Sequence, residues 1–349
     1  MNFIAALVFA ASICAYVNAT FTVASSTTEA RISSLNHVSH ARQWTINAAT
    51  ARDSLNSIDL DLAGRVYVSY ASSLPRGVLG YVHVLGDSKS VVNAVTVSNG
   101  DADDDDDDDE NEGDLHVVMS TSAEATRGYL LTEIVVASSG IVSKLKSTRS
   151  AQVVVQDGVL LTSSATEELQ IKATGSSAVY VAAPSATVSV RVFQLEAKGT
   201  GKLQITVESL TATDKVQLEA ESTAKISILS SLVETAFLEV EAEDSSSVCL
   251  SASTVKALTY EGEASSRISM PNASTQYSST GSFACVGMAV PVREPACVSH
   301  DCLGSSTESG QAILPQEEVS ASVEASVSSF QSFAAVVAAS MVAATAVLL

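Results

Sequence analysis

Apolar and polar residues alternate through the middle of the chain, which predicts short β-strands. Residues 58–62 read Ile-Asp-Leu-Asp-Leu, residues 66–70 read Val-Tyr-Val-Ser-Tyr, and runs rich in valine continue to residue 97. Alternation with β-branched residues is typical of strands that bury one face. No long stretch of this region has the 3.6-residue period of a helix. We therefore predict an all-β domain over residues 57–270, preceded by a polar arm at 20–56.

From residue 169 the alternation becomes an internal repeat, marked by a small residue at one fixed position of each unit. These small residues are 24, 23, 22 and 20 residues apart. The positions four and two before each of them, and six and eight after it, are all apolar, and the position just before it is charged. The small residues are Ala173, Ala197, Ala220, Ala242 and Gly262; the charged ones are Lys172, Glu196, Glu219, Glu241 and Glu261; and the apolar column four positions before is Leu169, Phe193, Val216, Leu238 and Leu258.

The repeat predicts a parallel β-helix, a solenoid with coils of roughly 20–24 residues. Each unit holds two strands joined by a small polar corner, and it is too short to bury its apolar face without a neighbour stacked on it. Small residues at one phase suit a crowded corner, and the charged residues before them are expected to point outward. An antiparallel meander in a sandwich or barrel is the alternative, but it does not require a small residue at the same phase of five units.

The repeat also carries a resemblance to a known family. Residues 169–173 and 193–197 combine an apolar-x-apolar strand with a charged residue and an alanine, and glycines follow at the corners. With these segments, the stretch from Ile58 to Met270 resembles the auto-transporter adhesin, head GIN domain family. The resemblance implies a secreted or surface β-helix with an adhesive role. This chain differs by a long acidic insertion and a cysteine-bearing tail.

The N-terminal segment is predicted to be a secretory signal peptide, residues 1–19. An apolar run from Ile4 to Val17 is followed by small residues at the −3 and −1 positions before Thr20, although the first residues carry no Lys or Arg. A buried N-terminal helix is the alternative. Cleavage after Ala19 would direct the mature chain out of the cell.

The C-terminal segment fits a glycosylphosphatidylinositol (GPI) attachment signal. Three small residues begin at Ser320, a ten-residue spacer follows at 323–332, and residues 333–349 form an apolar tail without a charge. We predict attachment at Ser320, with 305–332 as a polar linker. One alternative is attachment at Ser309–Gly310. Another is a transmembrane anchor, although the tail is short for this role because a spanning helix needs about 20 apolar residues. A third is a tail without function.

Four cysteines remain after signal cleavage, as expected for a chain in an oxidising compartment. Cys249 follows an inward position and therefore faces outward, where a cysteine of the tail at 271–304 can reach it. Sequence leaves three pairings open, and our hypothesis is Cys249–Cys285 with Cys297–Cys302. Metal binding is the rival interpretation, but the last pair has only His300 nearby and no matching second pair.

Charge adds an acidic loop to this picture. The chain has a formal net charge of −20, and eleven of the fourteen residues at 101–114 are acidic. Self-repulsion keeps such a block extended, so a solvated loop between two strands is expected. The functional alternative is weak Ca²⁺ binding by oxygen ligands such as Asp103, Asp105 and Asp107, although the spacing does not match an EF-hand loop.

No catalytic motif accompanies these features. The five histidines are scattered, and the sequence has no nucleophile elbow, phosphate-binding loop or dinucleotide fingerprint. Some β-helix proteins act on polysaccharides with paired carboxylates or an arginine base, so Asp157, Glu196 and Arg191 are the candidates for such an enzyme. We predict that the chain is not an enzyme and uses no cofactor.

The expected function is therefore a structural or adhesin-like role at the extracellular face of the membrane or in the cell wall. The expected partner is an extracellular glycan or surface protein, bound by the polar outer face of the solenoid. Strong acidity excludes a nucleic-acid partner. Asn272 opens a glycosylation sequon just past the last predicted coil. The alternative is a polysaccharide lyase or hydrolase.

Overall fold

The computed structural model describes residues 21–51, 53–100, 113–121, 127–263, 267–273, 275–277, 280–281, 283, 285–299 and 302. The chain divides into two units, Met1–Ser305 and Ser306–Leu349, and every described residue belongs to the first. The predicted signal peptide, nearly all of the acidic loop and the predicted anchor region lie outside the described residues. Within the described part, no helix is long and apolar enough to span a membrane.

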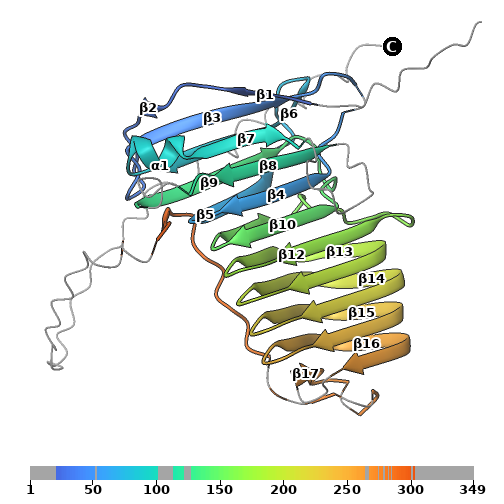
Figure 1. The fold of residues 1–349 in the computed structure, drawn as a ribbon. Helices are drawn as coiled ribbons and strands as arrows, with labels where there is room; N and C mark the ends of the chain where they lie inside the picture. Colours follow the sequence, from blue (N-terminus) through green and yellow to red (C-terminus); the bar gives the residue numbers. More distant parts are fainter. Residues whose placement is uncertain are drawn as a thin grey trace, which may run out of the picture. The chain divides into compact units, whose positions relative to one another are not determined.

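The described part is almost entirely β, as predicted, with one short helix (Figure 1). The elements are β1 (Thr22–Ser25), β2 (Glu29–Ala30), β3 (His40–Asn47), β4 (Ser57–Leu62), β5 (Arg65–Tyr70), β6 (Val78–Gly86), α1 (Lys89–Asn93), β7 (Val95–Asn99), β8 (Asp114–Met119), β9 (Tyr129–Val136), β10 (Lys144–Arg149), β11 (Gln152–Gln156), β12 (Glu168–Ala173), β13 (Ala178–Ala197), β14 (Lys202–Ala220), β15 (Lys225–Ala242), β16 (Ser247–Glu263), β17 (Ile268–Ser269) and β18 (Ala296–Cys297).

Strands β10 to β17 form a parallel β-solenoid. The long strands β13 to β16 each wrap around three sides of a coil, and each pairs in parallel with the next. We call the side formed by β4, β10, β12 and the last parts of β13–β16 the ladder face. The opposite side, formed by β5, β11, the first parts of β13–β16 and β17, is the strap face. A narrow third side runs from residues 187–190 to 254–257.

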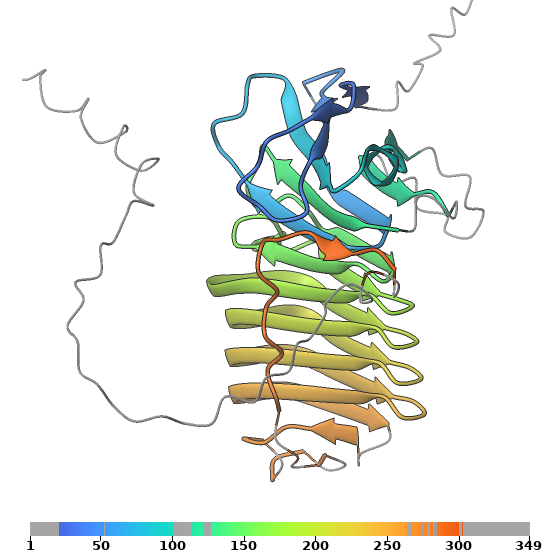
Figure 2. The same cartoon turned by 90° about the vertical axis from the view of Figure 1, so that its left-hand side faces the viewer.

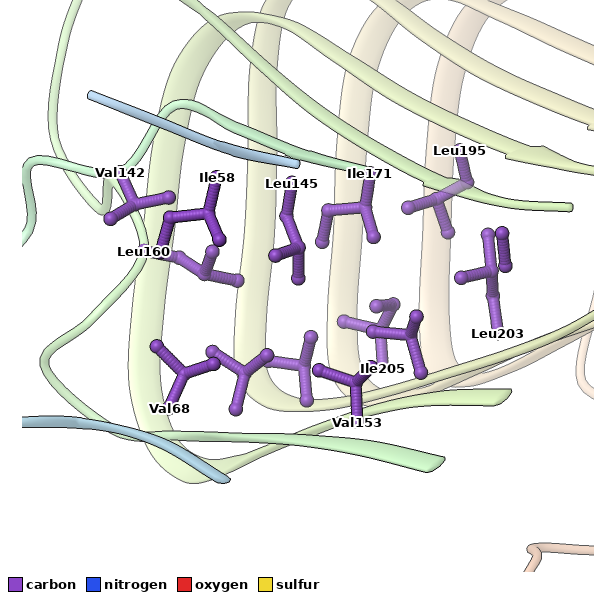
Figure 3. Packing of buried hydrophobic residues seen from close by; sticks show 14 of the residues in the cluster. Ile58, Val68, Val142, Leu145, Val153, Leu160, Ile171, Leu195, Leu203 and Ile205 are labelled. Carbon is purple, nitrogen blue, oxygen red and sulfur yellow. The ribbon is translucent and has the colours of Figure 1, made fainter. Parts of the chain in front are cut away.

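Residues of successive coils stack in columns through the interior. Leu169 pairs with Phe193, Phe193 with Val216, and Val216 with Leu238, and all four side chains are buried. A second column, Ile58, Leu145, Ile171 and Leu195, crosses the upper part of Figure 3, with strap-face residues opposite it. The parallel pairing confirms the predicted solenoid and excludes the antiparallel meander for this region.

The last coil departs from the predicted alignment. Gly262 pairs with Val240 rather than with Ala242, and Tyr260 rather than Leu258 lies beside Leu238. Leu258, expected in the interior, is 89% exposed. The strand keeps its offset of 22 residues up to Glu263, and the offset falls to 20 only where Ile268 pairs with Val248. Because Leu258 and Tyr260 are both apolar and two positions apart, alternation alone did not distinguish the two registers.

The N-terminal end of the solenoid is built out of chain order. The coil formed by β4 and β5 lies between the β8–β9 coil and the β10–β11 coil. Beyond β9, strands β6, β3 and β1 add in antiparallel fashion, so part of the predicted polar arm is sheet. Trp44 of β3 is buried in the main core. The short helix α1 begins after Ser88, whose Oγ accepts a hydrogen bond from the Val91 N–H.

The cysteine-bearing tail crosses the strap face (Figure 2). We call residues 285–297 the strap. One end is joined to β16 by the Cys249–Cys285 disulfide, and the other forms β18, which pairs with β9. Between these ends, side chains of the strap face hold the strap backbone. Gln204 donates to the Met288 carbonyl oxygen at 2.9 Å, and Arg65 donates to the Val292 carbonyl oxygen at 2.7 Å. Tyr67 donates to the Pro291 carbonyl oxygen, and Arg293 forms an ion pair with Glu133. The strap thus ties the last full coils to the N-terminal end.

We predict that the Leu238→Ala substitution lowers the free energy of unfolding by about 2–5 kcal/mol, because it removes buried methyl groups and leaves a cavity in the interior column. The matched control is Leu258→Ala, at the exposed position, which is expected to change stability by less than about 0.5 kcal/mol. Urea unfolding followed by circular dichroism measures both. Equal losses for the two variants would contradict the register of the last coil.

Candidate functional site

Charged side chains form an outward column along the ladder face. Adjacent strands place Asp59, Lys146, Lys172, Glu196, Glu219, Glu241 and Glu263 in register. The predicted outward positions are confirmed for the first four repeats. In the fifth repeat the member is Glu263 rather than Glu261, because of the register change described above.

Opposite charges neutralise the upper part of this column. The Lys146 ammonium lies 3.2 Å from Asp59, and the Lys172 ammonium lies 2.8 Å from Glu196. Lys198, at the following corner, contacts Glu196 at 3.0 Å and Glu221 at 2.7 Å. Hydrogen bonds to Glu221 and Glu196 hold the pKa of Lys198 well above its usual range. Glu196 is only 7% exposed, so two lysines compensate a nearly buried carboxylate.

Below Glu219, which Lys198 contacts at 3.4 Å, the described part of the column carries carboxylates without a lysine beside them. Burial, followed by the nearby carboxylates of Glu243, Glu263 and Glu219, raises the pKa of Glu241. Burial also raises the pKa of Glu219. Like charges directly across neighbouring strands destabilise a sheet. This end of the ladder face therefore favours protonation or a positively charged partner.

A polar hollow opens near the N-terminal end of the solenoid. Its volume is about 760 Å³, within the range typical of small-molecule sites. Four separate segments contribute its wall, which combines hydroxyls, amides, two carboxylates, an ammonium group and two aliphatic side chains. The lining residues are Ser54, Asn56, Gly140, Ile141, Ser143, Lys144, Leu161, Glu167, Glu168 and Gln170.

Two amide side chains of the lining, those of Asn56 and Gln170, have defined surroundings. The side-chain oxygen of Asn56 is buried and accepts no hydrogen bond from any described residue. It lies beside Gly113 and is closed to solvent, so a ligand in the hollow cannot donate to it. The Gln170 side chain is held by the neighbouring strand, because its amide nitrogen donates to the Gln194 amide oxygen at 3.0 Å. The hollow therefore offers a fixed set of donors and acceptors beside an aliphatic wall.

The candidate catalytic residues do not form a common site. Arg191 pairs with Asp214 at 3.4 Å and donates to the Thr166 carbonyl oxygen. Glu196 lies between Lys172 and Lys198, and the Asp157 side chain accepts from the Gly158 N–H in a turn. Each of the three residues is engaged with a different partner. Among the described residues, no cluster of His, Cys, Asp or Glu could hold a metal ion.

Cys249 of β16 and the three tail cysteines form two disulfides, Cys249–Cys285 and Cys297–Cys302. These are the pairs of our hypothesis, and they leave no thiolate for the rival metal site. Asn272 is exposed, and its side-chain amide donates to the Ala252 carbonyl oxygen at 2.8 Å. The Ca²⁺ candidates Asp103, Asp105 and Asp107, and the predicted attachment residue Ser320, lie outside the described residues.

The hollow was not predicted from the sequence. Its residues come from positions 54–56, 140–144, 161 and 167–170, and no motif links these segments. They meet only because β4 lies beside β10, and β10 beside β12, in the stacked coils. The sequence indicated only that the segments before residue 169 do not follow the regular repeat, and an interruption of the repeat is a place where a hollow can form.

Comparisons with known proteins give weak likenesses. No protein-family model and no curated protein matches the sequence, so the resemblance to the head GIN domain family stays a prediction. Solved structures with some similarity include candidate adhesins from Bacteroides fragilis (14% identity, TM-score 0.36, covering 64% of this chain and 93% of that one) and from Parabacteroides distasonis (16%, 0.36, 64% and 94%). Another is a candidate lipid-binding protein from P. distasonis (11%, 0.29, 64% and 93%). Likenesses at this level carry no argument about function, so the proposals below rest on this molecule.

We predict that Glu241→Gln stabilises the protein at pH 7, by about 0.2–1 kcal/mol, the size of a cross-strand charge contact. The pKa of Glu241 is raised in the folded chain, so the folded state is penalised where the group is ionised. The penalty fades as the pH falls toward the group's ordinary pKa of 4.5, and the advantage of the variant should fade with it.

Urea unfolding at a series of pH values measures this difference. The control is Glu234→Gln, which removes the partner of Lys256 instead of a repulsive charge and should not stabilise. An advantage of Glu241→Gln that is the same at all pH values would contradict the assignment to charge.

Proposed function

We propose that this chain is a secreted, surface-attached, non-enzymatic β-helical protein with an adhesin-like role, and that it binds neutral or cationic saccharides in the polar hollow. The observation that carries the proposal is the hollow itself, with its mixed polar and aliphatic wall. The rigid solenoid presents this recess on a fixed scaffold.

The chemistry of the hollow suits a hydroxyl-rich ligand. The carboxylates of Glu167 and Glu168 can accept hydrogen bonds, and the Lys144 ammonium can donate them. Ile141 and Leu161 provide an aliphatic surface for the C–H groups of a sugar ring. Two carboxylates against one ammonium give the wall a net negative charge, which disfavours acidic sugars and favours neutral or amino sugars.

Export and attachment are part of the same proposal. Two disulfides are consistent with folding in an oxidising compartment, which residues 1–19 would reach as a signal peptide. The exposed Asn272 would carry a glycan. Ser320 would receive the lipid, and residues 333–349 would be removed.

The contacts of the candidate catalytic residues support a non-enzymatic role. Asp157, Glu196 and Arg191 are each engaged with partners of their own, and none of the three lines the hollow. The adhesin-like role thus depends on binding alone.

Surface attachment is tested by expressing the full chain in eukaryotic cells and staining them without permeabilisation. We expect surface signal that is released by phosphatidylinositol-specific phospholipase C, and secretion into the medium when residues 333–349 are deleted. Ser320→Pro should lower the anchored fraction, with Ser309→Pro as the matched control. Surface signal that resists the phospholipase would contradict lipid attachment, and intracellular retention of all forms would contradict export.

Ligand binding is tested by titrating the protein with neutral oligosaccharides, chitosan oligomers and polygalacturonate. The double variant Glu167→Gln, Glu168→Gln should weaken the binding of neutral and amino sugars about tenfold or more, because a hydrogen bond to a carboxylate contributes about 1.5–3 kcal/mol and one to a neutral amide only about 0.5–1.5 kcal/mol. Glu29→Gln, at an exposed site on β2, is the control and should bind as the parent does. Tightest binding to polygalacturonate, or binding that the double variant does not change, would contradict the assigned ligand class.

A further inference from the structure

The last part of β16 forms an edge of the ladder face. On one side this strand pairs in parallel with β15 as far as Glu263. On the other side, Tyr277 covers residues 255–257 of this strand. The tyrosine hydroxyl accepts a hydrogen bond from the Ala257 N–H at 2.8 Å and lies 3.3 Å from the Val255 carbonyl oxygen. Beyond Ala257, no described residue pairs with this side of the strand.

The direction of the free backbone groups follows from these contacts. In parallel pairing, the N–H and C=O of one residue point to the same side, and the side alternates from residue to residue. Val255 and Ala257, which pack on the interior, point away from β15. The strand turns a corner at Leu258, and beyond it the inward residues are Tyr260 and Gly262, so the N–H and C=O groups of these two point to the open side. The outward residues point back to the preceding coil, as the Gln170 N–H does when it donates to the Ser143 carbonyl oxygen. The side chains of Leu258, Thr259, Glu261 and Glu263 are exposed. The edge therefore presents a row of donors and acceptors to another strand.

The edge is also marked by charge. Glu261 lies beside Glu239, and Glu263 lies beside Glu241. Farther up the same face, lysines occupy the places next to carboxylates, as Lys146 does beside Asp59 and Lys172 does beside Glu196. At the edge, a strand that supplied cations at alternate positions would continue this arrangement. The exposed Leu258 adds an apolar contact at the start of the segment.

We propose that the edge of β16, from Leu258 to Glu263, binds an extended basic segment of a partner protein, which adds to the solenoid as a further strand. Main-chain hydrogen bonds give this kind of strand addition its affinity, and alternate side chains give it specificity. The segment carries Lys or Arg at every second position, facing Glu261 and Glu263, with small or apolar residues between them. This inference is independent of the saccharide site.

The same charges argue against a second copy of this chain as the occupant. Two β16 edges brought together would place Glu261 and Glu263 of one copy against those of the other, and like charges across a strand pair are destabilising. Charged residues on an edge commonly prevent self-association. A basic strand is attracted by the glutamates of the edge, and the repulsion that prevents self-association does not act on it.

The test uses fluorescent peptides and the full chain, with binding followed by fluorescence anisotropy. The probe alternates lysine and valine, one control replaces lysine by glutamate, and a second has the composition of the probe with all lysines at one end. We expect saturable binding of the probe, about tenfold weaker binding of the clustered peptide, and no binding of the acidic one. Equal affinity for the alternating and clustered peptides would overturn the proposal.

Variants separate the edge from the acidic loop at 101–112, which also attracts lysine. The double variant Glu261→Lys, Glu263→Lys should lose probe binding about tenfold or more, whereas Glu208→Lys, Glu234→Lys, with the same change of charge on other strand segments, should retain it. A probe that is N-methylated at every second residue loses strand donors without a change of charge and should also bind more weakly, because strand addition depends on main-chain hydrogen bonds. Binding that survives the changes at 261 and 263, and disappears when residues 101–112 are deleted, would overturn the proposal.

Discussion

A coil of about 22 residues cannot shield its own apolar face from water, and the rest of this structure depends on that constraint. Each coil buries the inward residues of the next, so Leu169, Phe193, Val216 and Leu238 must lie in one column. In-register stacking then brings equivalent outward residues of successive coils to the spacing of paired strands, about 4.8 Å. The charge pattern of the ladder face is thus a direct consequence of how the interior is packed.

Stacking also leaves the two ends as places where the repeat must stop. At the N-terminal end, antiparallel strands close the stack, and an out-of-order coil lies between β8–β9 and β10–β11. The strap connects this end to β16 through the Cys249–Cys285 disulfide and β18. The polar hollow lies where early irregular coils meet the regular ones, and the acidic edge lies at the opposite end. Both proposed binding sites therefore occur where the repeat is interrupted.

Sequence periodicity predicted the solenoid because inward positions in four repeats share both spacing and chemistry. It placed the fifth repeat two residues out of register, because Leu258 and Tyr260 are equally apolar and only tertiary pairing separates them. Outward direction and proximity to the tail suggested the Cys249–Cys285 pair. The hollow and the path of the strap could not be predicted, because they depend on contacts between segments as distant as Arg65 and Val292.

The most direct test of the central claim measures distances along one outward column. Gln170, Gln194, Gln217 and Glu239 lie in register on four successive strands. Spin labels at residue 170 and at each of the other three positions in turn should give separations that increase by about 4.8 Å per coil. Separations that do not increase in this order would contradict the stacked parallel coils.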